Sequence, residues 1–366
     1  MSNESALLFF DFINVVSSLE NTLNFLSINR LIIPFNEAPN CVFVRNGVAC
    51  EQVMKLGGIT RLTDKIRWKC SRKDCNGTKS IRYGSIFKES NLPIQSLLAI
   101  MWHWCMGDSY TLISTKFGLS EHTIVNWANI FREVCCADLI TMDLRIGGPG
   151  VIVEMDESNL KKKPKHNIGS AWHMNEQWVW GAVERNNSSK FVAMFLPHHL
   201  NTNGILIADR RRSAILPQIL KWIKPGSVIY SDMCSAYWVN TGETLTNLEN
   251  IQEVLDYVDP MTGEVGKNYT HRAVNHSLNF VDWQNPEVHT QTIEGCWGSK
   301  LKYQFKSMKG VSRELIPSYV DMAMWKSWKI SQYEPFERPH KFFREFIEFV
   351  YIEFIEIVYI VSQRLY

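Results

Sequence analysis

Two apolar runs in the middle of the chain end in an aspartate, and this pattern constrains the fold more than any other feature. The segment VIVEMDE carries Asp156 and the segment SVIYSD carries Asp232. Short, β-branched runs of this kind predict buried strands. A third carboxylate, Glu294 in HTQTIEG, opens an apolar and basic stretch with helical spacing. The three acids therefore mark the ends of two predicted strands and the start of a predicted helix.

Three acidic oxygen ligands suit Mg²⁺ or Mn²⁺, provided that the fold brings these elements together. Two such ions, roughly 3.5–4 Å apart, activate a water or hydroxyl and stabilise a leaving oxygen in phosphoryl transfer. A single acid at a strand end is often only a solvated cap. The presence of Asp156, Asp232 and Glu294 in this order favours a catalytic metal site.

Five segments between about residues 150 and 328 follow one another without a missing block: MDESNLKKKPKHNIG, WVWGAVER, IKPGSVIYSDMCSAY, YTHRAVNHSLNFVDW and HTQTIEGCWGSKLK. Together they resemble the transposase domain of Merlin-type DNA transposons and of related bacterial insertion-sequence transposases. The resemblance implies a cut-and-paste DDE enzyme with a ribonuclease-H-like core. It also implies that Asn275, His276 and His289 lie close to the site.

In this family-based reading, the first reaction hydrolyses a phosphodiester at the transposon end, and the exposed 3′-hydroxyl then attacks target DNA. Asp156 and Asp232 would hold the metal pair, and Glu294 would complete the shell of one ion. The expected partners are transposon ends, target DNA and further copies of the chain in a homo-oligomer. Two alternatives stay open: a transposase-derived DNA-binding protein that no longer cuts, and a ribonuclease-H-like nuclease without strand transfer.

The spacing of the carboxylates departs from the family pattern in one place. Asp232 and Glu294 are 62 positions apart, which is longer than the family usually shows. The excess lies at about residues 240–268, a polar stretch with Gly, Asn and Asp. This composition predicts an insertion on the surface, where added residues cost little free energy.

Basic residues are grouped locally, whereas the net charge of the whole chain is only +2. One group follows Asp156 and another follows Glu294, and both are expected to contact DNA phosphates. These residues are Lys161, Lys162, Lys163 and Lys165 in the first group, and Lys300 and Lys302 in the second. The run from Arg210 to Arg212 lies away from the carboxylates and is expected to be solvated surface. Glu157 is expected to face solvent, with a hydrogen-bonding role beside the site as the alternative.

Four of the nine cysteines form two pairs in the N-terminal third. Cys41, Cys50, Cys70 and Cys75 resemble a zinc ribbon, in which four thiolates hold one Zn²⁺. Four residues separate Cys70 from Cys75, as in a regular knuckle, but eight separate Cys41 from Cys50. The neighbouring segments WKC and TKSIRYGSIF match the zinc-binding segment of the transposase family. Free buried cysteines, or a site with one intact half, remain the alternatives.

A helix-turn-helix is predicted after the cysteines. Tyr110–Phe117 reads as a short helix, Gly118 as the turn and Ser120 as the cap of a recognition helix from Glu121 to Cys135. Asn126 and Arg132 are expected to read base edges in the major groove. The same polar spacing also suits plain exposure to solvent.

The fold class expected from these features is α/β. A zinc-ribbon-like segment (37–90) and a helix-turn-helix region (91–145) precede a ribonuclease-H-like catalytic domain (150–330, with the insertion at about 240–268). Residues 1–36 form a helical lead, and residues 331–366 are expected to form an amphipathic helix on the core or on another copy. Glutamates at 345, 348, 353 and 356 argue against a membrane span. Without a basic leader, the chain is expected to be nuclear in a eukaryote or cytoplasmic in a bacterium, and not secreted.

Overall fold

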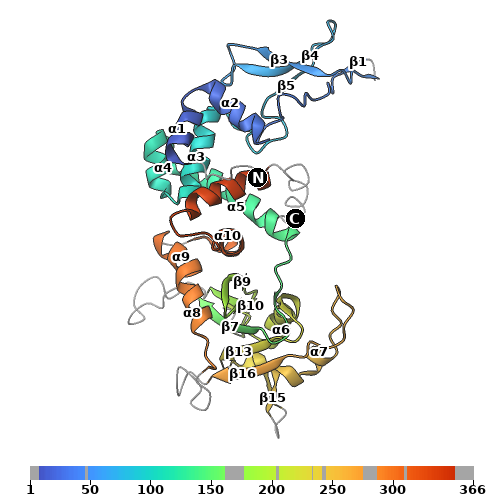
Figure 1. Ribbon diagram of the computed structural model, residues 1–366, viewed down its shortest axis with the longest axis vertical. Coiled ribbons are helices and arrows are strands. Elements are labelled where there is room, and N and C mark those ends of the chain that lie inside the picture. Colours follow the sequence, from blue (N-terminus) through green and yellow to red (C-terminus); the bar gives the residue numbers. More distant parts are fainter. Residues whose placement is uncertain are drawn as a thin grey trace. The chain divides into compact units, whose positions relative to one another are not determined.

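The computed structural model describes residues 8–45, 48–160, 177–202, 206–232, 234–240, 245–274, 287–308 and 311–350. The chain divides into two compact units, one made of Met1–Asp138 with Tyr333–Tyr366 and the other of Leu139–Gln332. Both contain helices and sheets (Figure 1), so the fold is mixed α/β, as expected. Across the described ranges, no helix is long and apolar enough to cross a membrane.

The first unit contains a group of helices whose ends follow from the local sequence. They are α1 (Phe9–Val16), α2 (Leu19–Ile28), α3 (Ile94–Met106), α4 (Tyr110–Phe117) and α5 (Glu121–Thr141), together with helical residues 338–350. Gly118 ends α4 with a φ of 61°, a left-handed conformation that glycine adopts without strain. The hydroxyl of Ser120 then accepts the N–H of Thr123 at the start of α5. The predicted helix, turn and cap are confirmed, although α5 continues beyond the predicted end.

Aromatic side chains join the two ends of the chain within this unit. Phe12 of α1 stacks on Trp102 of α3 with ring centroids 4.1 Å apart, and Phe343 meets the same indole edge-on at 4.9 Å. Phe346 packs edge-on against Phe131 of α5 at 5.7 Å. The C-terminal helix is therefore part of the core that the N-terminal helices build, and not a separate appendage.

The four cysteines at 41, 50, 70 and 75 lie in or next to a small antiparallel sheet. Its strands are β3 (Met54–Gly58), β4 (Ile66–Cys70) and β5 (Thr78–Ser80), and a hairpin of β1 (Val44–Arg45) and β2 (Val48–Ala49) precedes them. Met54 and Trp68 are each 1% exposed, because alternate residues of the strands face the interior.

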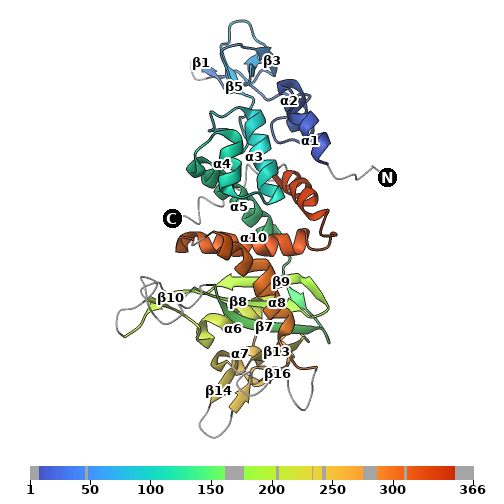
Figure 2. The same cartoon turned by 90° about the vertical axis from the view of Figure 1, so that its left-hand side faces the viewer.

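The second unit is built on a five-stranded sheet in the order β16-β13-β7-β8-β9. The strands are β7 (Ile152–Asn159), β8 (Trp178–Glu184), β9 (Asn187–Phe195), β13 (Val228–Asp232) and β16 (Thr270–Val274). β7, β8 and β9 form an antiparallel meander, whereas β13 runs parallel to both β7 and β16. Figure 2 shows helix α8 (Gln291–Cys296) crossing these strands.

Helical segments cover the sheet on both faces. The chain continues from α8 through η5 (Trp297–Lys302) and α9 (Tyr303–Ser307), and α10 (Ile316–Lys329) packs against β9. Helix α6 (Arg212–Trp222) packs against η3 (Ser235–Tyr237) on the side that Glu157 faces, opposite Asp156. The single-turn π segment η5 is of a kind that often occurs at functional sites.

The stretch at residues 240–268, predicted to be a polar surface insertion, is exposed at most of its described positions but also forms part of the fold. It carries the chain from β13 to the adjacent parallel strand β16, through the hairpin of β14 (Trp238–Asn240) and β15 (Leu245–Asn247), η4 (Leu248–Asn250) and α7 (Gln252–Leu255). Leu248 and Val254 are completely buried, and Ile251 is 2% exposed. Parallel neighbours require a crossover connection, and this one contributes core residues of its own.

Candidate active site and cysteine cluster

Asp156 and Asp232 lie on neighbouring strands of the central sheet. β7 and β13 pair in parallel register as far as Glu154 and Tyr230, and two further residues on each strand lead to the two aspartates. Equivalent residues of parallel strands in register point to the same face. The carboxylates are close enough that the charge of Asp232 raises the pKa of Asp156.

The environment of Asp156 disfavours its charged form. The pKa of Asp156 is raised to about 7, chiefly by burial and further by the charges of Asp232 and Glu157, although a hydrogen bond from Trp297 lowers it. The indole Nε1 of Trp297 donates to Oδ2 of Asp156 at 2.9 Å. A bound cation would compensate for this cost, and a carboxyl group with so perturbed a pKa is a candidate for function.

The indole of Trp297 can pack against β8 because residue 181 of that strand is a glycine. Gly181 pairs directly with Asp156 across the two strands. A Cβ atom at Gly181 would lie 2.6 Å from Cη2 of Trp297 and 2.8 Å from the carbonyl oxygen of Val192. Trp297 is 2% exposed, so the ring cannot move aside into solvent. Trp297 belongs to the stretch that the sequence predicted to be helical, but its contact with Asp156 was not predicted.

Glu294 lies on α8, one helical turn before Trp297 and hence on a similar side of the helix. It is exposed, and its Oε1 accepts the hydroxyl of Thr290 at 3.3 Å. The three predicted carboxylates do not have ligand atoms that all lie within 4.8 Å of one another; among the described residues only a cysteine group meets that condition. Three carboxylates that bind two ions roughly 3.5–4 Å apart need not lie as close together as the ligands of a single ion.

Glu154 on β7 fixes the start of α8. Its side chain is completely buried, and it accepts the backbone N–H groups of Thr292 at 2.8 Å and Ile293 at 3.2 Å, and the Thr292 hydroxyl at 2.9 Å. The first N–H groups of a helix have no partner within it, and a carboxylate there also faces the positive end of the helix dipole. Arg185 Nε donates to the same carboxylate at 2.7 Å and balances its charge. Glu154 thus holds the helix of Glu294 against the sheet.

Arg185 also holds the chain segment that leads into α8. It donates to the carbonyl oxygens of Glu287 at 2.5 Å and His289 at 2.8 Å. Nδ1 of His289 is within hydrogen-bond distance of Arg185 at 3.2 Å and of the Gln291 N–H at 3.4 Å. This ring nitrogen is engaged by the protein itself.

Glu157 and Arg210 differ from their predicted roles. Glu157 is 7% exposed, accepts from Arg210 Nη2 at 2.9 Å and accepts the hydroxyl of Tyr237. The guanidinium of Arg210 also lies 3.8 Å from the ring centroid of Trp178. The prediction that these two residues are merely solvated is wrong, because alternation along β7 turns Glu157 to the interior face opposite Asp156, where a partner must balance its charge.

The predicted DNA contacts have mixed outcomes. Lys161, Lys162, Lys163 and Lys165, as well as Asn275 and His276, lie outside the described residues. Lys300 donates to the hydroxyl of Ser327 on α10 at 2.9 Å, and Lys302 is half-buried. Both lysines follow Glu294 on the same continuous helical stretch.

On α5, Asn126 is exposed but Arg132 is not. Arg132 is 1% exposed and donates to the hydroxyl of Tyr110 at 3.2 Å and to the side chain of Asn129. The prediction that Arg132 reads base edges is therefore wrong, since base readout needs an accessible side chain. Ala128 and Cys135, about one helical turn before and after Arg132, are also buried, so Arg132 lies on the inner side of the helix.

The four N-terminal cysteines converge. Their sulfur atoms all lie within 4.8 Å of one another, with Cys41 and Cys75 at 3.7 Å and Cys50 and Cys70 at 3.7 Å. Four sulfurs at these distances can hold a tetrahedral metal such as Zn²⁺, whose Zn–S bonds are about 2.3 Å. The β1–β2 hairpin folds back the eight residues between Cys41 and Cys50, so that the Cys50 N–H donates to the carbonyl of Phe43 at 2.9 Å.

Backbone N–H groups point at two of these sulfurs. The N–H of Arg72 lies 3.4 Å from Sγ of Cys70, and that of Gly77 lies 3.4 Å from Sγ of Cys75. A Cβ atom at Gly77 would lie 2.4 Å from Sγ of Cys41, so the cluster requires glycine at this position. The Gly77 N–H lowers the pKa of Cys75, but burial and the other thiols raise it to about 12. A cation would stabilise the thiolates that metal binding needs.

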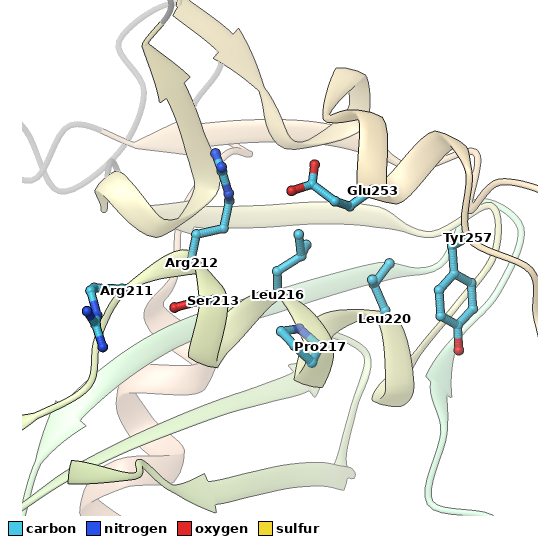
Figure 3. Close-up of a pocket in the computed structure, with 8 residues that line it drawn as sticks. All are labelled: Arg211, Arg212, Ser213, Leu216, Pro217, Leu220, Glu253 and Tyr257. Carbon is cyan, nitrogen blue, oxygen red and sulfur yellow. The ribbon is translucent and has the colours of Figure 1, made fainter. Parts of the chain in front are cut away.

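A pocket of about 640 Å³ lies elsewhere on the second unit. Figure 3 shows its apolar floor, formed by Leu216, Pro217 and Leu220 of α6, and charged side chains around it that include Arg212 and Glu253. None of the predicted carboxylates lines it.

Compared with family models, curated proteins and solved structures, the chain shows no significant match to any.

Proposed function

We propose that the chain is a DDE transposase that catalyses metal-dependent DNA cleavage and strand transfer at transposon terminal repeats. Asp156, Asp232 and Glu294 would ligate Mg²⁺ or Mn²⁺. The observation that carries the proposal is the register of β7 and β13, in which Asp156, three residues before the end of β7, is at the position next to Asp232 at the end of β13. The buried Glu154 adds to it by tying the helix of Glu294 to β7.

The topology of each unit supports the same assignment. An antiparallel meander, β9-β8-β7, followed by the parallel strands β13 and β16, is the arrangement expected of a ribonuclease-H-like core. The four clustered cysteines beside an antiparallel sheet support a zinc-ribbon-like segment.

The protein's own part in the reaction is positioning and charge balance. When bound, the divalent ions would activate the attacking water or 3′-hydroxyl and stabilise the leaving oxygen. Asp156 would have to lose its proton to act as a ligand, and the indole of Trp297 orients one of its oxygens. Glu154 and Arg185 hold α8 in place before DNA arrives, so little reorganisation is needed during the reaction.

Two departures from the family pattern, the irregular cysteine spacing and the long separation of Asp232 from Glu294, would favour a non-catalytic derivative if they disrupted the fold. The irregular cysteine spacing is spanned by a hairpin, and the extra residues before Glu294 form a folded crossover. Neither feature now argues against catalysis.

The test is cleavage of labelled duplexes that carry the DNA flanking the coding sequence as candidate transposon ends, with Mg²⁺ or Mn²⁺. Asp156→Asn, Asp232→Asn and Glu294→Gln should each lower cleavage by at least about 100-fold and leave DNA binding intact. Glu253→Gln, an exposed carboxylate of the same unit, is the matched control and should cleave like the wild type. Cleavage that survives in all three site variants would contradict the proposal.

A further inference from the structure

Positive charge is concentrated in the cysteine-bearing segment. Residues 41–80 contain nine Lys or Arg against three Asp or Glu, a net charge of +6, in a chain whose total is +2. The remaining residues therefore carry a net charge of −4. Two of the three acids are engaged: Asp64 pairs with the buried Arg82 at 2.5 Å, and Asp74 pairs with Arg72 at 2.7 Å.

The sheet β3-β4-β5 displays part of this charge on one face. Lys55 pairs directly with Lys69, and Lys69 pairs with Thr78. The next positions on the same face are Gly57 opposite Arg67, and Arg67 opposite Ser80. All the side chains on this face are polar or basic, while Met54, Trp68 and Cys70 occupy the buried face. The exposed face of the sheet thus has no apolar side chain.

The direct opposition of two lysines is unfavourable for the sheet itself, because like charges at paired positions of antiparallel strands destabilise it. Both lysines are exposed, and within the described ranges no carboxylate forms an ion pair with Lys55, Arg67 or Lys69. A locally unfavourable arrangement of this kind is expected where a ligand supplies the missing counter-charge.

Gly57 of β3 lies on the same face and adds no side chain to it. The Cβ atom of an alanine at Gly57 would meet only Cβ of Lys69, at an ordinary 3.8 Å, so packing does not require glycine there. The φ of Gly57 is also not positive, so the backbone does not require it. Glycine within a strand commonly marks the close approach of another backbone or a ligand.

We propose that the exposed face of β3-β4-β5, formed by Lys55, Arg67 and Lys69, binds the phosphate backbone of duplex DNA. The choice of duplex DNA among polyanions rests on the proposed function. The absence of apolar side chains disfavours insertion into a membrane or a protein interface, where an apolar centre is the rule. Contacts to phosphates position a protein on DNA without reading the base sequence. This face would therefore have a different role from α5, where Asn126 was predicted to read base edges.

The test measures binding of the full chain, loaded with zinc, to a labelled duplex at several salt concentrations and without added Mg²⁺ or Mn²⁺. In Lys55→Gln/Lys69→Gln, affinity near 0.1 M salt should fall about tenfold or more. The slope of log K against log salt should become shallower by about 0.9 for each phosphate that the variant no longer neutralises. Because the substitutions relieve a repulsion, Tm and zinc content should not fall. The control Lys88→Gln/Lys221→Gln removes two exposed charges elsewhere and should keep the wild-type slope.

Equal slopes for the Lys55/Lys69 variant and the control variant would overturn the proposal. So would a variant that loses binding to anionic phosphatidylserine vesicles while its DNA binding is unchanged. Binding is measured without catalysis, so an enzyme that fails to cleave would refute the proposed function and leave this result standing.

Discussion

Glu154 Oε2 accepts the backbone N–H of Thr292 at 2.8 Å, and this hydrogen bond ties the helix of Glu294 to the strand of Asp156. We predict that Glu154→Gln loosens this end of α8. Removing the charge leaves Arg185 without its buried counter-ion, which typically costs about 3–5 kcal/mol. Hydrogen exchange at the amides of Thr292 and Ile293 should accelerate, and metal-dependent cleavage should fall.

The matched control is Glu157→Gln, on the same strand but the opposite face. It breaks a buried pair with Arg210 and should cost stability as well, yet the Thr292 amide should keep its protection relative to global unfolding. If both variants accelerate exchange at Thr292 to the same extent, Glu154 is not a specific anchor of α8.

Gly181→Ala should displace the indole of Trp297 from Asp156. The added Cβ atom would lie 2.6 Å from that ring and 2.8 Å from a backbone oxygen, so we expect a loss of about 1–3 kcal/mol of stability and a changed tryptophan fluorescence. Gly295→Ala on α8 meets nothing within 4 Å and should be neutral or slightly stabilising. Equal stabilities for the two variants would show that the contact is not tight.

The raised pKa of Asp156 predicts a pH-dependent stability without added divalent ions. The folded protein holds a proton on Asp156 up to about pH 7, whereas the unfolded chain loses it near pH 4. Between these values the folded state binds more protons, so the stability from this group falls as pH rises. Asp156→Asn should therefore be more stable than the wild type at pH 8, by an amount on the order of 4 kcal/mol, and similar at pH 4. Urea unfolding of both proteins at pH 4 and pH 8 measures this difference in stability. A difference that is the same at both pH values would contradict a raised pKa of Asp156.

The cysteine cluster predicts one zinc per chain. Cys75→Ser should abolish stoichiometric zinc and destabilise residues around β3–β5, because structural zinc contributes directly to folding. Cys105→Ser, at a buried cysteine outside the cluster, should keep its zinc even if it lowers stability. Elemental analysis of the two purified variants measures the zinc content of each. A wild-type protein that is folded but free of zinc would show that the thiols serve packing alone.

Local patterns predicted what depends on neighbours in the sequence. The β-branched runs indicated β7 and β13, and the Gly118 turn with the Ser120 cap marked the boundary between α4 and α5. Amphipathic spacing also indicated a C-terminal helix, although not that Phe343 would pack on Trp102.

The features that the sequence did not reveal depend on the tertiary contacts that each side chain makes. Arg132 has the spacing of an exposed residue, but tertiary contacts bury it against Tyr110. Glu154 was hidden within an apolar run, although its even spacing from Asp156 was a usable signal that both face the same side. The polar composition of residues 240–268 concealed a crossover, because composition does not show that Leu248, Ile251 and Val254 are buried while other apolar residues of the stretch are exposed.

The most direct test of the central claim is whether the purified chain joins a cleaved candidate transposon end to target DNA in the presence of Mg²⁺ or Mn²⁺. The account predicts cleaved and joined products with the wild type, and neither product with Asp156→Asn, which should still bind the DNA. Cleavage without joining would identify a nuclease, and tight binding without either product would identify a non-catalytic DNA-binding protein. Joined product from Asp156→Asn at the wild-type rate would contradict the assignment of the site itself.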